Sequence, residues 1–178
     1  MQLITVYEIK LKLDTRRKMK FLVFSDSHSS PNRILKAVNM YAGKCDAIIF
    51  LGDGIRDLSL VEAKYPEIPI LKVKGNCDLG FSDVQEEQIY NFDGINILIT
   101  HGHKHGVKYG YDSLIYYAQE KEVDAVLFGH THVPCEKILY FDDKRLTLFN
   151  PGSIATEGTF GVVNIANGVL VTNTAKIH

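Results

Sequence analysis

The chain has 178 residues, of which 46% are hydrophobic, so we expect one domain with a substantial core. Its 20 basic and 21 acidic residues give a formal net charge of -1, which excludes a broad electrostatic affinity for nucleic acid or an anionic membrane. The three cysteines form neither an even set nor a CxxC pair, which indicates reduced thiols in a cytoplasmic protein.

Residues 1–18 differ from the rest of the chain. Leu3 to Leu13 alternates loosely as a strand would, and the charged sequence DTRRK then interrupts the pattern. The first twenty residues contain six Lys or Arg but no apolar run followed by a cleavage site, and no later run is long enough to span a bilayer. We therefore expect an N-terminal extension of unknown role, a single domain over residues 19–178, and no membrane partner.

From Lys20 onward, short apolar runs alternate with helical patterns. Ser30-Pro31 predicts a helix start with an N-cap hydroxyl and a proline at the first helical position, and Gly43 suits the end of that helix. A second helix is predicted over 55–65. Strands are predicted at 20–26, 46–53 and 68–76.

The second half of the chain is rich in β patterns. A helix over 111–122 and a strand over 124–130 separate the first of its hairpins from the others. The early βαβ alternation followed by hairpins predicts an α+β (α/β) fold with two packed sheets covered by helices. The hairpins are predicted at 87–100 around Asp93-Gly94, at 137–150 around Asp142-Asp143 and at 159–173 around Asn167-Gly168.

Five apolar runs each end directly in a cluster of polar residues. The carboxyl ends of strands are where α/β folds place their sites, and six of the seven histidines lie in or beside these clusters. A single Asp-x-His at a strand end is usually a turn or capping device, so the joint pattern carries the argument. The clusters are Asp26-Ser27-His28, Gly52-Asp53, Gly75-Asn76, His101-Gly102-His103 and Gly129-His130-Thr131-His132.

The clusters predict a metal centre. Burying two carboxylates and several imidazoles in one crevice is costly unless cations compensate their charge and polarity. The candidates outnumber the three or four ligands of a zinc site, so we expect two ions that share a carboxylate. Nitrogen and oxygen donors suit Mn²⁺, Fe²⁺, Co²⁺, Ni²⁺ or Zn²⁺, and two such ions clamp a phosphoryl group and deprotonate a shared water. The candidate ligands are Asp26, His28, Asp53, Asn76, His101, His130 and His132.

In order, the motifs D-x-H, G-D, G-N, H and G-H-x-H resemble those of the calcineurin-like metallophosphoesterase superfamily, over residues 19 to about 166. The closest resemblance is to its small single-domain phosphodiesterase branch. It implies a four-layer αββα fold, in which two mixed β-sheets form a sandwich flanked by helices. It also places the segment 150–153 (NPGS) near the site, although a plain turn is the alternative. By the same resemblance, Asp26, His28, Asp53 and His132 would hold one ion, and Asp53, Asn76, His101 and His130 the other.

The chain departs from the superfamily pattern at two positions. Asp57 stands one residue later than the second Asp of the usual G-D-x-x-D motif, so we assign it no catalytic role. Cys77 stands where many phosphomonoesterases of the superfamily carry the histidine that protonates the leaving group, and losing such a general acid can forfeit about 10²–10⁴-fold in rate. We expect His103 to compensate by touching the phosphate or the leaving oxygen, with a loop histidine as the alternative, and we assign His105 to the surface.

The sequence thus predicts a phosphodiesterase in which a hydroxide bridging two divalent metals, Mn²⁺ first among them, attacks a small phosphodiester. Asn76 and His103 are the expected catalytic residues. A protein-binding scaffold of the kind found in the retromer subunit Vps29 is the rival, but every ligand position here keeps a competent donor. A phosphomonoesterase is a further alternative, and strong nucleic-acid binding is not expected. The physiological substrate, the metal in vivo and a possible homo-oligomer stay open.

Overall fold

The computed structural model describes residues 18–41, 44–142 and 144–177. Residues 1–17 of the predicted extension lie outside the described residues, as do Gly43 at the expected helix end and Asp143 in the expected turn. Within the described part of the chain, no helix has the length and apolar character needed to cross a membrane.

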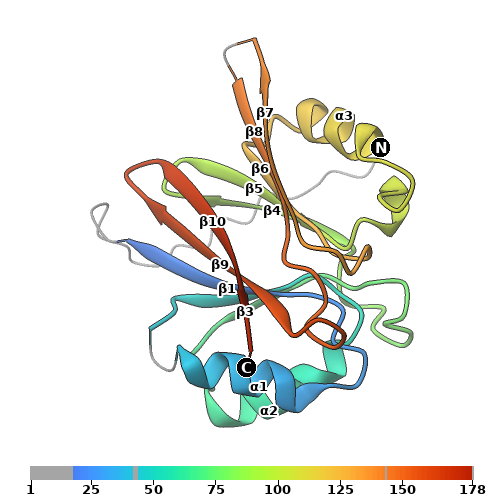
Figure 1. Ribbon diagram of the computed structural model, residues 1–178, viewed down its shortest axis with the longest axis vertical. Coiled ribbons are helices and arrows are strands. Elements are labelled where there is room, and N and C mark those ends of the chain that lie inside the picture. Colours follow the sequence, from blue (N-terminus) through green and yellow to red (C-terminus); the bar gives the residue numbers. More distant parts are fainter. Residues whose placement is uncertain (1–17, 42–43, 143, 178) are drawn as a thin grey trace.

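Two five-stranded sheets pack face to face (Figure 1). Both are mixed, since each contains two parallel and two antiparallel strand pairs. The first sheet has the order β10 (Val169–Lys176), β9 (Thr159–Ala166), β1 (Met19–Phe24), β2 (Ala47–Phe50) and β3 (Ile70–Lys72). The second has the order β4 (Glu87–Phe92), β5 (Ile95–Thr100), β6 (Ala125–Leu127), β8 (Lys144–Asn150) and β7 (Cys135–Phe141).

Helices cover the outer face of each sheet, which confirms the predicted four-layer arrangement (Figure 1). Helices α1 (Pro31–Met40) and α2 (Ser59–Lys64) pack on the first sheet, and α3 (Asp112–Glu120) packs on the second. Alternation along β1 shows how the layers arise, since Phe21 lies in the core between the sheets and Leu22 lies in the core under α1 and α2. The central strands β1, β2 and β6 are buried on both faces, which makes their sequences almost continuously apolar.

Three local predictions need correction. The Ser30 side chain forms no capping hydrogen bond; instead its backbone N–H donates to Asp57 Oδ2 at 3.2 Å. The predicted helix 55–65 is divided into a 3₁₀ turn, η1 (Ile55–Leu58), and α2. The predicted strand 68–76 pairs only over β3, because the chain beyond Lys72 leaves the sheet as a loop that carries Gly75 and Asn76 toward the site.

Candidate metal centre

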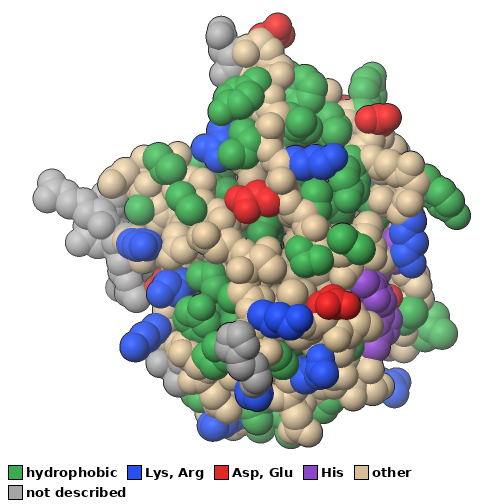
Figure 2. Space-filling model, viewed as in Figure 1, with side chains coloured by type: hydrophobic (Ala, Val, Ile, Leu, Met, Phe, Trp, Pro, Cys, Tyr) green, Lys and Arg blue, Asp and Glu red, His purple; other side chains and the backbone are tan. Residues whose placement is uncertain are grey.

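The loops that carry the five polar clusters meet at one edge of the sandwich. They follow β1, β2 and β3 in the first sheet and β5 and β6 in the second, whose carboxyl ends point the same way because these strands are parallel within each sheet. Backbone hydrogen bonds join the loops, including one from Asp26 N to Gly52 O at 3.0 Å and one from Gly129 N to His101 O at 3.2 Å. Figure 2 shows histidine side chains gathered at one edge of the molecular surface.

One group of donors consists of Asp26, His28 and His132. The two imidazole Nε2 atoms face each other at 3.2 Å, and Asp26 Oδ1 lies 3.1 Å from His132 Nε2 and 3.8 Å from His28 Nε2. The other oxygen of Asp26 accepts hydrogen bonds from Ser25 Oγ at 2.6 Å and from His130 N at 3.0 Å. Asp26 is fully buried, and its Oδ1 has no hydrogen-bond partner among the described residues. A buried carboxylate oxygen in this position favours a cation.

The second group consists of Asp53, His101 and His130. His101 Nε2 lies 3.4 Å from Asp53 Oδ2 and 3.2 Å from His130 Nδ1. The Nδ1 atom of His101 is 2.7 Å from the carbonyl oxygen of Leu51. A carbonyl only accepts hydrogen bonds, so Nδ1 carries the proton and Nε2 is directed toward the group, as is usual for histidine ligands of metals.

Asp53 lies between the two groups. Its Oδ2 is 3.4 Å from His101 Nε2 in one group and 4.0 Å from His28 Nε2 in the other, while its Oδ1 accepts a hydrogen bond from Cys77 N at 2.7 Å. Asp26 Oδ1 also approaches the second group, at 4.0 Å from His101 Nε2. The two carboxylates therefore lie between the two groups.

The pKa shifts show that positive charge is favoured between these carboxylates. Burial opposes ionisation of Asp53, but its hydrogen bond to His101 and the charge of that ring hold its pKa well below the ordinary value. Burial would likewise lower the pKa of His101, yet the bond to Asp53 and the charges of both carboxylates raise it. Burial and the charge of His101 lower the pKa of His130 to about 4. A bound divalent cation would supply the positive charge that the protonated His101 ring supplies in the metal-free protein.

Backbone strain is concentrated in the same loops. A positive φ is uncommon for residues other than Gly, although Asn, Asp and His tolerate it best, and such conformations cluster at functional sites. Here it falls on three histidines, with φ of 38° at His28, 68° at His130 and 63° at His132, and also on Asp26 and Asp53. The strands and close loop contacts hold these residues in the left-handed region. At Gly75, for example, a Cβ atom would lie 2.1 Å from Asp53 Oδ1, so only glycine fits.

The nitrogen and oxygen donors, the unpaired carboxylate oxygen and the facing imidazoles fit divalent cations. The structure brings six of the seven predicted ligands into the two groups. The seventh, Asn76, is exposed beside them, and its amide donates to Cys77 Sγ at 3.2 Å. Cys77 Sγ also lies near His28 and Asp53, but burial and the neighbouring Asp53 raise the pKa of the thiol. Cys77 is therefore a protonated thiol at neutral pH and a poor anionic ligand.

His103 lies next to the second group. Its ring centroid is 5.5 Å from that of His101 and 6.1 Å from that of His130, and its Nδ1 is buried without a hydrogen-bond partner among the described residues. Burial and the charge of His101 lower the pKa of His103, which disfavours the protonated form that a general acid needs.

The assignment of His105 to the surface is wrong. Its side chain is 11% exposed, its Nε2 lies 2.9 Å from Glu87 Oε1, and its ring packs on Tyr117 at 4.7 Å. His105 thus ties the loop that carries His103 to β4 and α3. The sequence pattern did not indicate this contact, because Glu87 and Tyr117 are brought to the loop only by the fold.

Asp78, to which the sequence analysis gave no role, organises the loop around Asp53. Its Oδ2 accepts hydrogen bonds from Asp53 N at 2.7 Å and Gly75 N at 2.8 Å, and its Oδ1 accepts from Gly54 N at 2.8 Å and Ile55 N at 2.9 Å. The bond to Gly75, three residues earlier, is a local Asx-type contact that the sequence could have suggested. The bonds to residues 53–55 depend on the pairing of β2 with β3 and could not be found locally.

Asp57 and the NPGS segment also support the site. Asp57 Oδ2 accepts a hydrogen bond from Ser27 Oγ at 2.6 Å, which fixes the loop between Asp26 and His28. Asn150 Nδ2 donates to Gly129 O at 2.8 Å, and Ser153 Oγ donates to Asp26 O at 2.8 Å. The segment therefore contacts two ligand-bearing loops and is more than a turn at the end of β8.

Comparisons with known proteins agree with this site. Residues 19–168 match the calcineurin-like phosphoesterase superfamily domain. The probable metallophosphoesterase YsnB of Bacillus subtilis is 33% identical over 137 residues, which cover 76% of this chain and 75% of YsnB. The crystal structure of a conserved protein of Streptococcus pneumoniae, a predicted phosphoesterase, has a TM-score of 0.73 and 29% identity, with 90% of each chain covered.

Two further solved structures share the fold at lower identity. An archaeal phosphodiesterase has a TM-score of 0.66 and 21% identity, with 88% of this chain and 100% of the archaeal chain covered. Vps29 of Entamoeba histolytica, complexed with Zn²⁺, has a TM-score of 0.62 and 19% identity, with 88% of this chain and 98% of the Vps29 chain covered. The family match and the relative at 33% identity establish the kinship: the chain belongs to the calcineurin-like phosphoesterase superfamily and to its small metallophosphoesterase branch.

Proposed function

We propose that this metallophosphoesterase is a phosphodiesterase that hydrolyses small phosphodiesters with two divalent cations, Mn²⁺ first among them. The observation that carries the proposal is the pair of donor groups around Asp26 and Asp53, in which Asp26 Oδ1 is buried without a hydrogen bond among the described residues. Bound there, the cations would neutralise phosphoryl oxygens and lower the pKa of a water molecule.

The residues of the chain supply the positioning. Asp53 would be shared by the two cations, with Asp26, His28 and His132 on one side and His101 and His130 on the other. Asn76 and His103 lie beside these ligands with side-chain groups available to contact the phosphoryl oxygens or the leaving oxygen. Because the pKa of His103 is lowered, we assign it a hydrogen-bonding contact in place of a proton donation.

Two features favour a diester over a monoester. The raised pKa of the Cys77 thiol makes it a weaker general acid than the histidine of related phosphomonoesterases. In addition, a cavity of about 340 Å³ begins at His28 and Asp53, which leaves room for a second ester group beside the reacting phosphorus. The substrate is therefore expected to be a small molecule with two ester arms.

The proposal is tested with chelator-treated protein and bis(p-nitrophenyl) phosphate. We expect no turnover without metal, restoration by Mn²⁺ when Mn²⁺, Fe²⁺, Co²⁺, Ni²⁺ and Zn²⁺ are supplied separately, and two ions per chain by elemental analysis. Asn76→Ala should remove most of the activity, whereas Asn173→Ala on the exposed edge of β10 should not. Equal turnover in chelator and in Mn²⁺ would contradict the proposal.

The same assays separate the alternatives. A protein that binds two ions yet turns over neither diesters nor monoesters would favour a Vps29-like scaffold. Cys77→His restores the imidazole of related phosphomonoesterases, so we expect it to raise monoester hydrolysis relative to diester hydrolysis. If wild type already prefers monoesters, the phosphomonoesterase alternative replaces the proposal.

A further inference from the structure

The cavity beside the metal centre is lined in part by residues to which the proposed reaction assigns no role. It is lined by the candidate ligands His28 and Asp53 and also by Arg56, Leu79 and Phe81. At about 340 Å³ it is at the small end of ligand pockets, which span roughly 300–1,000 Å³. It therefore suits one arm of a small diester better than a polymer.

Arg56 is the one arginine or lysine among the described residues that line this cavity. Its guanidinium lies over the ring of Phe81, 5.8 Å from the centroid, and no ion pair with a carboxylate is found for it among the described residues. The neighbouring acids are already engaged, since Asp78 accepts four backbone N–H groups and Asp57 accepts Ser27 Oγ and Ser30 N. Arg56 thus presents to the cavity a planar cation that has no carboxylate partner among the described residues, and such a group binds phosphate through two parallel hydrogen bonds.

The same cavity has an apolar part. Leu79 is 81% exposed at the cavity, and Phe81 is partly buried beneath the Arg56 guanidinium. An exposed leucine beside a stacked arginine and phenylalanine matches a ligand that combines an apolar or flat portion with an anion. Arg56 and the candidate ligands His28 and Asp53 line the same cavity, so one bound molecule can reach both the metal centre and Arg56.

We propose that this cavity binds an ester arm that carries a second phosphate, so that the preferred substrate is a small phosphodiester with one phosphorylated arm. Arg56 is then a specificity-determining residue that contacts the terminal phosphate. The inference rests on the proposed phosphodiesterase function and deepens it by naming the substrate class.

The test uses two matched pairs of diesters. Adenylyl-adenosine with and without a terminal 5′-phosphate forms one pair, and a diester of two glycerols with and without a terminal phosphate forms the other. Wild-type enzyme loaded with Mn²⁺ should prefer the phosphorylated member of at least one pair by about tenfold in kcat/KM, mainly through KM. Preference in the nucleotide pair alone would identify a nucleotide arm, and preference in both would identify a phosphorylated arm of either kind.

Variants assign the preference to Arg56. Arg56→Gln should reduce it to about one, Arg56→Lys should retain part of it, and Arg145→Gln, at the opposite end of the sandwich, should leave it unchanged. Equal kcat/KM for both members in wild type, or an equal loss on both members in Arg56→Gln, would overturn the inference.

Binding by metal-free protein distinguishes this inference from the proposed function. Calorimetric titration with the two adenylyl-adenosine compounds should show tighter binding of the phosphorylated one to wild type and no difference for Arg56→Gln. If this binding preference holds while no diester is hydrolysed, the pocket is supported and the phosphodiesterase proposal fails. If hydrolysis is observed without any preference in binding or turnover, the pocket assignment fails alone.

Discussion

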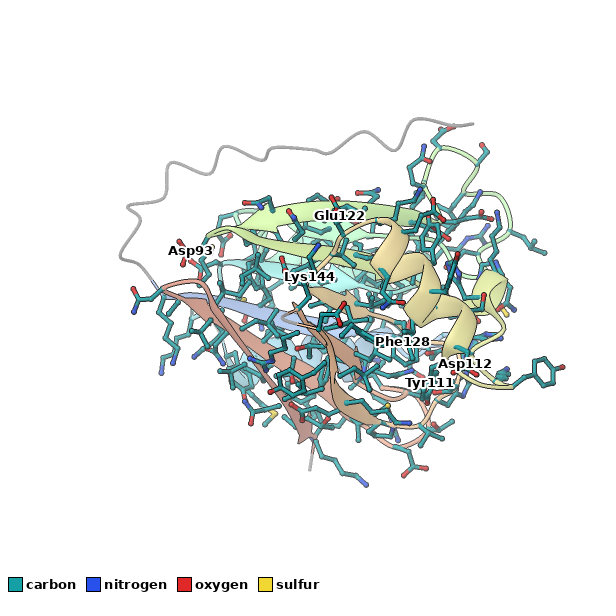
Figure 3. All side chains as sticks on the ribbon, turned by 90° about the horizontal axis from the view of Figure 1, so that it is seen from above. Asp93, Tyr111, Asp112, Glu122, Phe128 and Lys144 are labelled. Atoms are coloured by element: carbon teal, nitrogen blue, oxygen red, sulfur yellow. The ribbon has the colours of Figure 1, made fainter. Side chains whose placement is uncertain are left out.

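Both ends of the sandwich contain residues with positive φ angles, but among the described residues only the metal end places them on histidines. At the hairpin end they fall on Asp93-Gly94, Asp142 and Asn167-Gly168, which adopt the left-handed region at little cost, and on Glu122 just after α3. At the metal end they fall on His28, His130 and His132, for which that region is unfavourable. Figure 3 shows the separation, with Asp93 at one end and Phe128, two residues before His130, toward the other. Turns and a helix end account for the first end, whereas at the second the positive φ angles fall on candidate ligands, as is common at functional sites.

The cavities at the two ends make the same distinction. The cavity at the hairpin end is larger, about 610 Å³ against about 340 Å³ at the metal end. Its charged residues include Glu122 and Lys144, which pair with each other at 3.6 Å (Figure 3), and no group of metal donors is found there among the described residues. Volume therefore does not identify the functional end. The buried Asp26 Oδ1, which has no hydrogen bond within the described part of the chain, and the facing imidazoles identify it.

The largest expected effect comes from comparing one aspartate at each end. Asp53→Asn removes the negative charge between the two donor groups, so we expect the loss of at least one bound ion. Replacing a residue that only supports a metal ligand costs up to roughly 100-fold in activity, so kcat/KM should fall by more than that when Asp53 itself is changed. Asp93→Asn should leave both unchanged, because Asn also tolerates positive φ in the turn. Diester turnover measures kcat/KM, and elemental analysis measures the number of bound ions. A comparable loss in both variants would remove the distinction between the ends.

A smaller but still large effect is expected at Asp78. In wild type the two carboxylate oxygens of Asp78 accept four backbone N–H groups, whereas Asn has only one side-chain oxygen. We therefore expect Asp78→Asn to lower the free energy of unfolding of the metal-free protein by about 3 kcal/mol. Metal affinity should fall by roughly 10–100-fold, because the Asp53 loop loses its support. Asp83→Asn, nearby and exposed, is the matched control. Denaturant unfolding and metal titration measure the two quantities, and unchanged values for Asp78→Asn would show that the loop is held by other contacts.

The same contrast explains what the sequence could predict. Apolar alternation, helical periodicity and turn pairs are local signals, so the strands, the hairpin at Asp93-Gly94 and the clusters at strand ends could be read directly. Binding residues at the carboxyl ends of parallel strands follow from topology, which is why six of the seven predicted ligands lie together.

Contacts between loops could not be predicted in this way. The bonds from residues 53–55 to Asp78, and from the Asn150 amide to Gly129 O, join segments whose approach depends on sheet pairing. The burial of His105 against Tyr117 likewise depends on how α3 packs on the second sheet. The Ser30 side chain forms no cap because the N–H of Arg33 donates to the carbonyl oxygen of Ser30, while Asp57 from a distant turn accepts the N–H of Ser30.

The pH dependence of the metal-free protein should show the cost of crowding histidines at the metal end. The pKa of His130 is about 4 in the folded chain against an ordinary value of 6.5, so the unfolded state binds more protons between these values. The free energy of unfolding should therefore fall by about 1–2 kcal/mol as the pH drops from about 6.5 to 4, after allowance for the exposure of the ring. His101, whose pKa is raised, acts oppositely, with stability fully present below pH 6.5 and lost as the pH rises through its folded pKa.

His130→Gln isolates the first of these two contributions. In denaturant titrations between pH 4 and 6.5, the variant should lose less stability on acidification than wild type does. A slope that is the same in both proteins would mean that His130 is protonated as readily in the folded chain as in the unfolded one.

The smallest effect is the most direct measure of strain. Ser29 has a φ of 65° between His28 and Ser30, and its side chain is exposed, so Ser29→Gly relieves the strain without removing a predicted ligand. The left-handed region costs roughly 1–2 kcal/mol and glycine loses about 0.5–1 kcal/mol more in backbone entropy, so metal-free stability should rise by about 0.5–1 kcal/mol. Asn167→Gly, at φ 52° in a hairpin turn, should gain less, since Asn already tolerates this region. If both variants gain equally in denaturant unfolding, positive φ at the metal end is no costlier than in an ordinary turn, and strain ceases to mark the functional end.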